Sequence, residues 1–210
     1  MLRRLSVVPL VSIALFSFAG FANADIPGLT DFSGGVPIAG GSFVVGWIFN
    51  VNAPITVTAL GVYDPSGVLN SSSDVGIFNV VGQSLVVSTT VQSTGSALLD
   101  NFRYQSVSPV SLEQGGTYVI AMTNAVDGAS GMNSIITTAS QISYVNSAFD
   151  FGDSLIFPDP DNDGAQAPGI FGPNFTFETS ASTPEPAYSA LGVGFTALLG
   201  FGISRHLRRA

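Results

Sequence analysis

The 210-residue chain contains no cysteine, no lysine and only one histidine. The absence of cysteine excludes disulfides, iron–sulfur clusters, thiol nucleophiles and zinc sites built on thiolates. The single histidine, His206, and five of the six arginines lie near the two ends of the chain. Residues 25–183 therefore lack the side chains of a Ser-His-Asp triad, a Schiff base or an imidazole metal site.

Positive charge is almost absent from the middle of the chain. Residues 25–183 hold one base, Arg103, and 13 acids, which gives a net charge of 1 − 13 = −12. A body this acidic repels phosphate backbones, so we expect no nucleic-acid partner. With so few catalytic side chains, we also expect no enzymatic activity and no cofactor.

The N-terminus has the pattern of a secretory signal peptide. Arg3 and Arg4 precede an apolar run, which ends at Ala22-Asn23-Ala24. Small residues at the first and third positions of this tripeptide suit signal peptidase, so cleavage is predicted after Ala24. Residues 1–24 are then a signal helix that the mature protein lacks; the alternative is an uncleaved anchor, for which the run is short.

A second apolar segment, residues 187–203, lies near the C-terminus. Its 17 residues span roughly 26 Å as a helix, close to the lower limit for crossing a bilayer. A basic tail follows and predicts a transmembrane helix whose end stays in the cytoplasm. The alternative, a buried core helix, fits poorly with this charge cluster. The tail contains Arg205, His206, Arg208 and Arg209.

Pro184-Glu185-Pro186 immediately precedes the apolar segment. This order of motif, span and terminal arginines resembles the PEP-CTERM sorting signal of exported bacterial proteins, and the resemblance covers residues 183–210. It implies that a membrane-embedded exosortase recognises Pro184, Glu185 and Pro186 and processes the tail. It also implies that Arg205, Arg208 and Arg209 act as the basic stop.

The body, residues 25–178, has the periodicity of β-strands. Phe43, Val45, Trp47 and Phe49 alternate with a second set of residues, and Gly- or Asp-containing turns separate the runs. No segment keeps a helical period for three turns. We therefore predict an all-β body, a single jelly-roll-like antiparallel β-sandwich. Further strands are predicted at 55–59, 74–80, 84–91, 102–107, 117–122, 134–138, 142–145 and 175–177.

Several segments of the body also resemble an uncharacterised sandwich domain that is common in exported bacterial proteins. They are residues 55–63, 74–78 and 101–120, with 172–177 as the closing strand. This resemblance implies a fold but no chemistry. The small polar residues 179–183 and the Pro-Glu-Pro motif form a linker, 179–186, to the sorting segment 187–210.

A calcium site is one candidate in the body. Asp159, Asp161 and Asp163 stand at positions 1, 3 and 5 of a sequence whose sixth residue is Gly164, as in a calcium-binding loop. Position 12 is Ile170 rather than the usual glutamate, so an acidic surface loop is the simpler interpretation and no metal site is assigned.

Aromatic residues and acids provide the remaining candidates. Trp47 and the tyrosines could form a platform for sugar rings, although the phase of Trp47 favours the core. A pair of carboxylates could hydrolyse glycosides, although solvated turn residues are the simpler explanation. Arg103 is expected to pair with a nearby acid. The aspartates and glutamates considered are Asp64, Asp74, Glu113, Asp150, Asp153 and Glu178, and the tyrosines are Tyr63, Tyr104, Tyr118 and Tyr144.

The sequence therefore predicts an exported, surface- or matrix-associated structural or interaction protein. Its expected partners are an exosortase-type enzyme and, through residues 187–203, the cell-envelope membrane. The PEP-CTERM resemblance also implies a setting of extracellular polysaccharide. The alternative is a carbohydrate-binding module on the cell surface, which predicts solvent-facing aromatic residues in a row.

Overall fold

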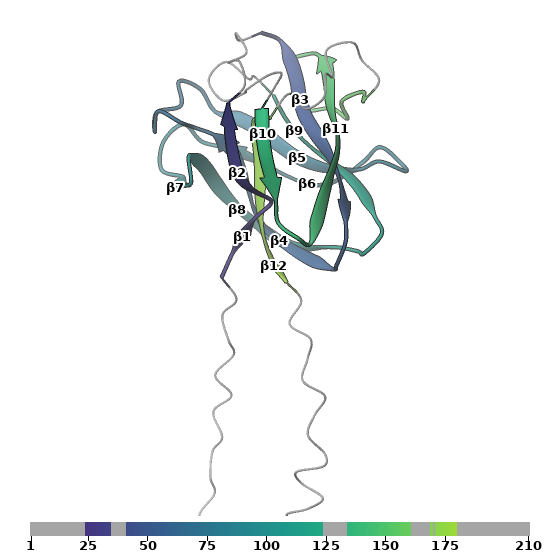
Figure 1. Cartoon of the computed structure of the whole chain (residues 1–210). Helices are drawn as coiled ribbons and strands as arrows, with labels where there is room; N and C mark the ends of the chain where they lie inside the picture. The colour runs from purple at the N-terminus through teal and green to yellow at the C-terminus, as the bar shows by residue number, and fades with distance from the viewer. Residues whose placement is uncertain (1–23, 35–40, 124–133, 161–168, 170, 180–210) are drawn as a thin grey trace, which may run out of the picture.

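The computed structural model describes residues 24–34, 41–123, 134–160, 169 and 171–179. These residues form strands and connections, with no helix among them (Figure 1). The strands are β1 (Ile26–Pro27), β2 (Leu29–Gly34), β3 (Phe43–Val51), β4 (Ile55–Tyr63), β5 (Ser73–Asn79), β6 (Ser84–Val91), β7 (Ala97–Leu99), β8 (Phe102–Leu112), β9 (Thr117–Thr123), β10 (Ser134–Thr138), β11 (Ile142–Phe151) and β12 (Pro173–Thr179).

Two five-stranded sheets pack as a sandwich. One has the order β1-β12-β4-β8-β7 and the other β11-β3-β9-β5-β6, while β10 and β2 form a separate two-stranded ribbon. All pairings are antiparallel. The predicted all-β class and sandwich packing are confirmed; the predicted helices at the two ends of the chain lie outside the described residues.

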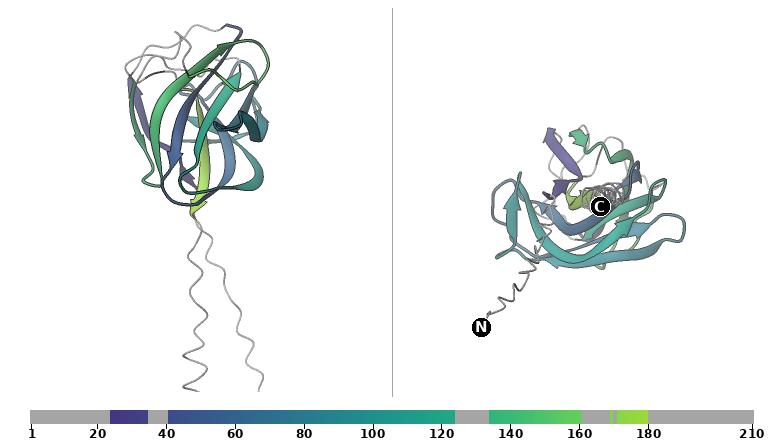
Figure 2. Two further views of the ribbon diagram at one scale, coloured as in Figure 1. Left: turned by 90° about the vertical axis from the view of Figure 1, so that its right-hand side faces the viewer. Right: turned by 90° about the horizontal axis from the view of Figure 1, so that it is seen from below.

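The antiparallel pairing of β1 with β12 brings the two ends of the described chain together. Ile26 lies opposite Phe177, so β1 begins where β12 ends. Both lie at the same end of the sandwich, the lower end in Figure 1 and in the left view of Figure 2. We call this the terminus end and the opposite one the loop end.

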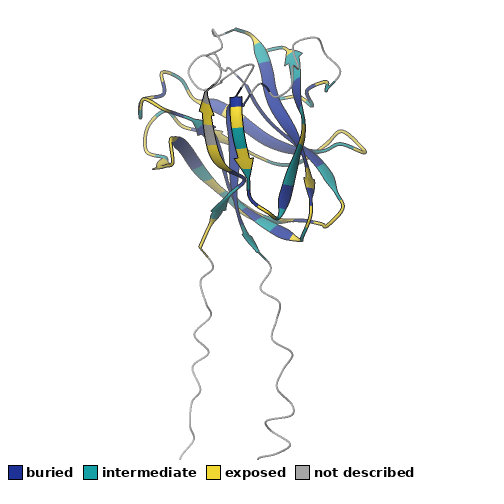
Figure 3. Ribbon diagram, viewed as in Figure 1, coloured by how far each residue is buried: buried dark blue, intermediate teal, exposed yellow. Residues whose placement is uncertain are grey.

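The core lies between the two sheets, because alternate residues of each strand face inward. Trp47 is fully buried and contacts aromatic rings of both sheets. Its indole N–H donates to the Pro173 carbonyl oxygen at 2.8 Å, which joins β3 to β12. Figure 3 shows buried residues concentrated on the strands. The largest fully buried aromatic residues are Trp47, Phe49, Phe171, Phe175 and Phe177.

A second, smaller cluster covers the outer face of the sheet containing β3. Val44, Ile48 and Phe78 belong to it, and Leu155 and Phe157 from the segment after β11 pack against it. The ring of Phe157 meets that of Phe78 edge to face, with centroids 6.1 Å apart. This segment explains how β3 and β9 can be buried on both faces, a pattern that simple alternation does not predict.

The sequence pattern located most strands but not their full length. The predicted strands at 84–91 and 134–138 have the observed bounds, whereas β8, β11 and β12 extend well beyond their predicted limits. Strands β1, β2 and β7 were not predicted. The two-residue β1, the polar β2 and the three-residue β7 are too short or too irregular to show a period of two.

Candidate functional site

The two ends of the sandwich differ in their connections. At the terminus end, the turns at 52–54, 80–83, 113–116 and 139–141 have three or four residues each. At the loop end, the connections at 64–72 and 152–172 are much longer. Binding sites in β-sandwiches are commonly carried on such loops, because the rigid sheets position them. The loop end is therefore the candidate binding end of the sandwich.

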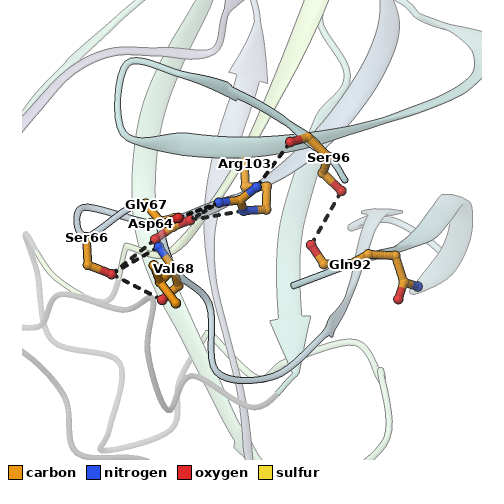
Figure 4. A network of polar contacts seen from close by, with 7 residues as sticks. All are labelled: Asp64, Ser66, Gly67, Val68, Gln92, Ser96 and Arg103. Atoms are coloured by element: carbon orange, nitrogen blue, oxygen red, sulfur yellow. Dashed lines mark hydrogen bonds and ion pairs between the residues drawn. The ribbon is translucent and has the colours of Figure 1, made fainter. Parts of the chain in front are cut away.

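A buried ion pair organises one side of the loop end (Figure 4). Arg103, at the start of β8, donates from Nη2 to Asp64 Oδ2 at 2.8 Å and from Nε to the same oxygen at 3.0 Å. Asp64 follows β4 and is 1% exposed, and Arg103 is 8% exposed. Two charges removed from water in this way need good geometry and further hydrogen bonds to be tolerated.

Arg103 also directs two further N–H groups at backbone oxygens. Nη2 reaches the Gly67 carbonyl oxygen at 2.8 Å, and Nη1 reaches that of Ser96 at 3.1 Å. The guanidinium thus ties the loop after β4 and the loop before β7 to β8. We refer to Asp64, Arg103, Gly67 and Ser96 as the arginine clamp.

The arginine clamp also contacts the β7–β8 hairpin. The two turn residues of this hairpin, Asp100 and Asn101, have φ angles of 49° and 63°. Both lie in the left-handed region that a two-residue hairpin of type I′ requires and that Asp and Asn tolerate. The backbone N–H of Asp64 donates to the Asn101 carbonyl oxygen at 2.6 Å. The hairpin tip is therefore held against the clamp.

A second buried polar side chain, Asn174, holds β2 in place. Its Oδ1 accepts from the Leu29 N–H at 2.9 Å, and its Nδ2 donates to the Leu29 carbonyl oxygen at 3.2 Å. Nδ2 also donates to the hydroxyl oxygen of Tyr104 at 2.8 Å. A Cβ at Gly28 would lie 2.9 Å from the Phe175 ring, so a larger residue there would require this buried ring to shift.

Tyr104 follows Arg103 on β8, and its hydroxyl oxygen accepts a hydrogen bond from Asn174. It therefore links the arginine clamp to the residues that hold β2. Burial raises the pKa of Tyr104 far above its usual value, and the negative charge of Asp100 raises this pKa further. The phenol therefore stays protonated at any physiological pH.

A cleft of about 220 Å³ opens between these two sides. We call it the β2/hairpin cleft. One wall is β2 and the other is the tip of the β7–β8 hairpin. The residues that line it are Leu29, Thr30, Asp31, Asp100, Asn101 and Phe102.

The exposed charge around the cleft has one sign. Arg103 is the only base in the described ranges, and it is buried against Asp64. Asp31 and Asp100 are both exposed at the cleft. Over the described part of the chain, the surface thus presents carboxylates without any exposed cation, and it attracts cations and repels anions.

Trp47 is fully buried, and Tyr104 and Tyr118 are buried as well, so the hypothesis of an aromatic platform built on Trp47 is wrong and its assignment to the core is right. Arg103 pairs with an acid as predicted. Asp64 is therefore engaged rather than free for acid–base chemistry.

The calcium hypothesis stays a prediction. Asp159 is exposed, but Asp161, Asp163 and Gly164 lie outside the described residues. Within the described ranges, no group of three acidic or histidine side chains is placed to hold a metal ion. The sorting residues also lie outside those ranges: Pro184, Glu185, Pro186, Arg205, Arg208 and Arg209.

Comparisons with known proteins add no family. No model of a known protein family matches the chain, and no curated protein matches its sequence. Among residues 24–179 as far as the structure describes them, no helix is long and apolar enough to cross a membrane. The predicted span 187–203 is not among them.

Sequence reasoning missed the cleft and one of its supports. Asn174 gave no sequence signal of a structural role, and its partner Leu29 is 145 residues away in the chain. The Asp100-Asn101 dipeptide was the one local signal available, because two such residues between short apolar runs favour a type I′ hairpin.

Proposed function

We propose that this chain is an exported, surface-attached structural or interaction protein, delivered by a PEP-CTERM-type sorting segment and without catalytic activity. The terminal sequence segments suggest export and sorting. The observation that supports the proposal best is the pairing of β1 with β12, which puts the first and last strands of the described chain at the terminus end.

This arrangement suits a domain that is attached at its C-terminus. Asp25, the first residue after the predicted cleavage, accepts a hydrogen bond from the Thr58 hydroxyl at 2.6 Å, so the chain is part of the fold from its proposed mature start. Thr179, the last residue of β12, leaves only a short linker before the Pro-Glu-Pro motif. An anchored molecule would then stand on its terminus end and present its loop end outward.

The strand order supports the finer assignment of a jelly roll. Strands β1-β12-β4-β8 in one sheet and β3-β9-β5-β6 in the other follow the jelly-roll order, in which consecutive strands largely alternate between sheets. This topology occurs in lectin domains, although a fold alone does not fix a function.

Intact mass of the protein from membrane and culture fractions of its native host tests the proposal. We expect a mass that matches residues 25 to about 186, which would require both cleavages. A mass that runs from Asp25 to Ala210 and is found only in membranes would contradict sorting and leave a plain anchor.

A charge-matched pair of variants sharpens this test. Glu185→Gln alters the motif and should leave the tail attached, so the longer mass should accumulate in the membrane. Glu178→Gln removes the same charge from β12, seven residues earlier, and should be processed normally. Equal processing of the two variants would show that the motif is not recognised.

The second candidate function, carbohydrate binding on the cell surface, is favoured by a different observation. The β2/hairpin cleft lies at the loop end, away from the proposed attachment, and is lined by hydrogen-bonding side chains. Because Trp47 is buried and cannot form a platform for sugar rings, this cleft is the candidate sugar-binding site.

A further inference from the structure

The positions of the basic residues limit where one class of protease can cut the chain. Arg103 is the only lysine or arginine between Arg4 and Arg205. Proteases of the trypsin type cleave after lysine or arginine, because a carboxylate in their specificity pocket binds the cationic side chain. Such a protease can therefore cut residues 5–204 at one peptide bond only, the bond between Arg103 and Tyr104.

The side chain of Arg103 is held away from any such pocket (Figure 4). It is 8% exposed, and its Nε and Nη2 both donate to Asp64 Oδ2, at 3.0 and 2.8 Å. Nη1 and Nη2 also donate to the carbonyl oxygens of Ser96 and Gly67. Asp64 thus already binds the group that the carboxylate of a protease must bind. Withdrawing the guanidinium would leave the Asp64 carboxylate buried without its partner, which is strongly unfavourable.

The backbone at Arg103 is covered on both sides as well. Strand β8 lies between β4 and β7, and Arg103 is opposite Val62 on one strand and Leu98 on the other. A protease that binds its substrate as an extended segment needs a free strand edge around the bond that it cuts. Strand β7 has only three residues, all exposed, so it is the easier of the two neighbours to detach. Its detachment alone would leave the guanidinium bound to Asp64.

We infer that the arginine clamp is a conformational lock against proteases specific for lysine and arginine, so that the Arg103–Tyr104 bond is cut only after the clamp and the β7–β8 pairing have both opened. Hydrolysis then breaks the bond between the Arg103 carbonyl carbon and the Tyr104 nitrogen, and water supplies the hydroxyl of the new carboxyl group and a proton for the new amine. The cleavage rate follows the population of this open state. The lock belongs to the folded body and does not depend on the proposed export; at a cell surface it would keep the loop end intact in the presence of such proteases.

The test is trypsin digestion of the full chain, solubilised in a polyoxyethylene detergent and followed by mass spectrometry. Residues 5–204 of the wild type should persist as one uncut fragment. Thr94→Arg places an arginine outside the clamp, at an exposed position of the connection before β7. This variant should be cut after residue 94 about a hundredfold faster than the wild type is cut after Arg103. Equal rates at the two sites, whether fast or slow, would overturn the lock.

Two further variants separate the clamp from overall stability. Asp64→Asn removes the charge that holds the guanidinium. Ile120→Ala truncates a fully buried side chain of β9, in the other sheet, and lowers stability by leaving a cavity. The rate of cleavage after Arg103 is divided by the unfolded fraction that urea unfolding gives for each variant. This ratio should be about tenfold higher for Asp64→Asn, because its bond is also exposed by local opening. Equal ratios would show that only global unfolding exposes the bond and would refute the clamp as the lock.

Discussion

The terminus end and the loop end of the sandwich are built by different interactions. At the terminus end, strands are joined by turns of three or four residues, and local backbone hydrogen bonds such as Gly116 N–H to the Glu113 carbonyl oxygen close them. At the loop end, Arg103 of the arginine clamp ties the connections that contain Gly67 and Ser96 to β8, and Asn174 ties β2 to β12. Local chain geometry suffices where turns are tight, whereas long loops need side chains that are distant in sequence.

Loss of the arginine clamp should destabilise the protein most. Arg103→Met leaves the Asp64 carboxylate buried without its partner, so the free energy of unfolding in urea should fall by about 3–5 kcal/mol. The double variant Arg103→Met with Asp64→Leu should recover most of this loss, because neither charge remains buried. A loss below 1 kcal/mol in the single variant would show that the clamp does not stabilise the loop end.

Asn174 allows the two ends to be compared with one residue type. Asn174→Leu strands the buried N–H and carbonyl of Leu29 and should cost about 3 kcal/mol of unfolding free energy. Asn52 at the terminus end is exposed and donates to the Ser140 carbonyl oxygen, so Asn52→Leu should cost less than about 1 kcal/mol. Similar losses in urea unfolding would remove the distinction between the ends.

Tyr104 gives the loop end a dependence on alkaline pH. Its folded-state pKa lies above the unfolded value of 10.0, so the stabilisation is complete below pH 10 and is lost as pH rises, because only the unfolded chain ionises. Between pH 10 and 11 the wild type should lose about 1 kcal/mol more unfolding free energy than Tyr104→Phe. Parallel pH profiles of the two proteins would contradict a buried, protonated phenol.

The smallest change in unfolding free energy is expected at two glycines, one at each end of the sandwich. Gly95 before β7 and Gly115 before β9 have φ angles of +83° and +81°, and a Cβ at either would meet no atom within 4 Å. Alanine at each position should therefore cost about 1 kcal/mol through backbone strain alone. Urea unfolding of the two variants measures both losses, and an unchanged free energy of unfolding in either variant would contradict the strain.

The sequence pattern predicts best the strands that are rich in β-branched residues. Residues 84–91 and 134–138 are rich in Val, Ile and Thr and were predicted with their observed bounds. Strand β2 has a polar, glycine-containing sequence, and the six residues of its span show no alternation. It is a strand because it pairs with β10 across a long separation in the chain, which is a tertiary preference rather than a local one.

The candidate site was less accessible to sequence reasoning. That Arg103 would find an acid followed from its being the single base of the body, but its partner Asp64 is 39 residues away and nothing local selects it. The role of Trp47 in the core followed from its phase among Phe43, Val45 and Phe49. The hydrogen bond of its indole to Pro173 did not, because that contact crosses from one sheet to the other.

Composition and residue pattern were enough to establish the strand-rich character of the body, its single base and its excess of negative charge. These properties depend on composition and on a period of two, which are local and additive. Only the folded structure shows that β2 and the β7–β8 hairpin lie on either side of one cleft and that Asn174 supports β2 there. Alternation fixes which face of a strand is buried, but sheet order and loop path decide which distant residues face each other across it.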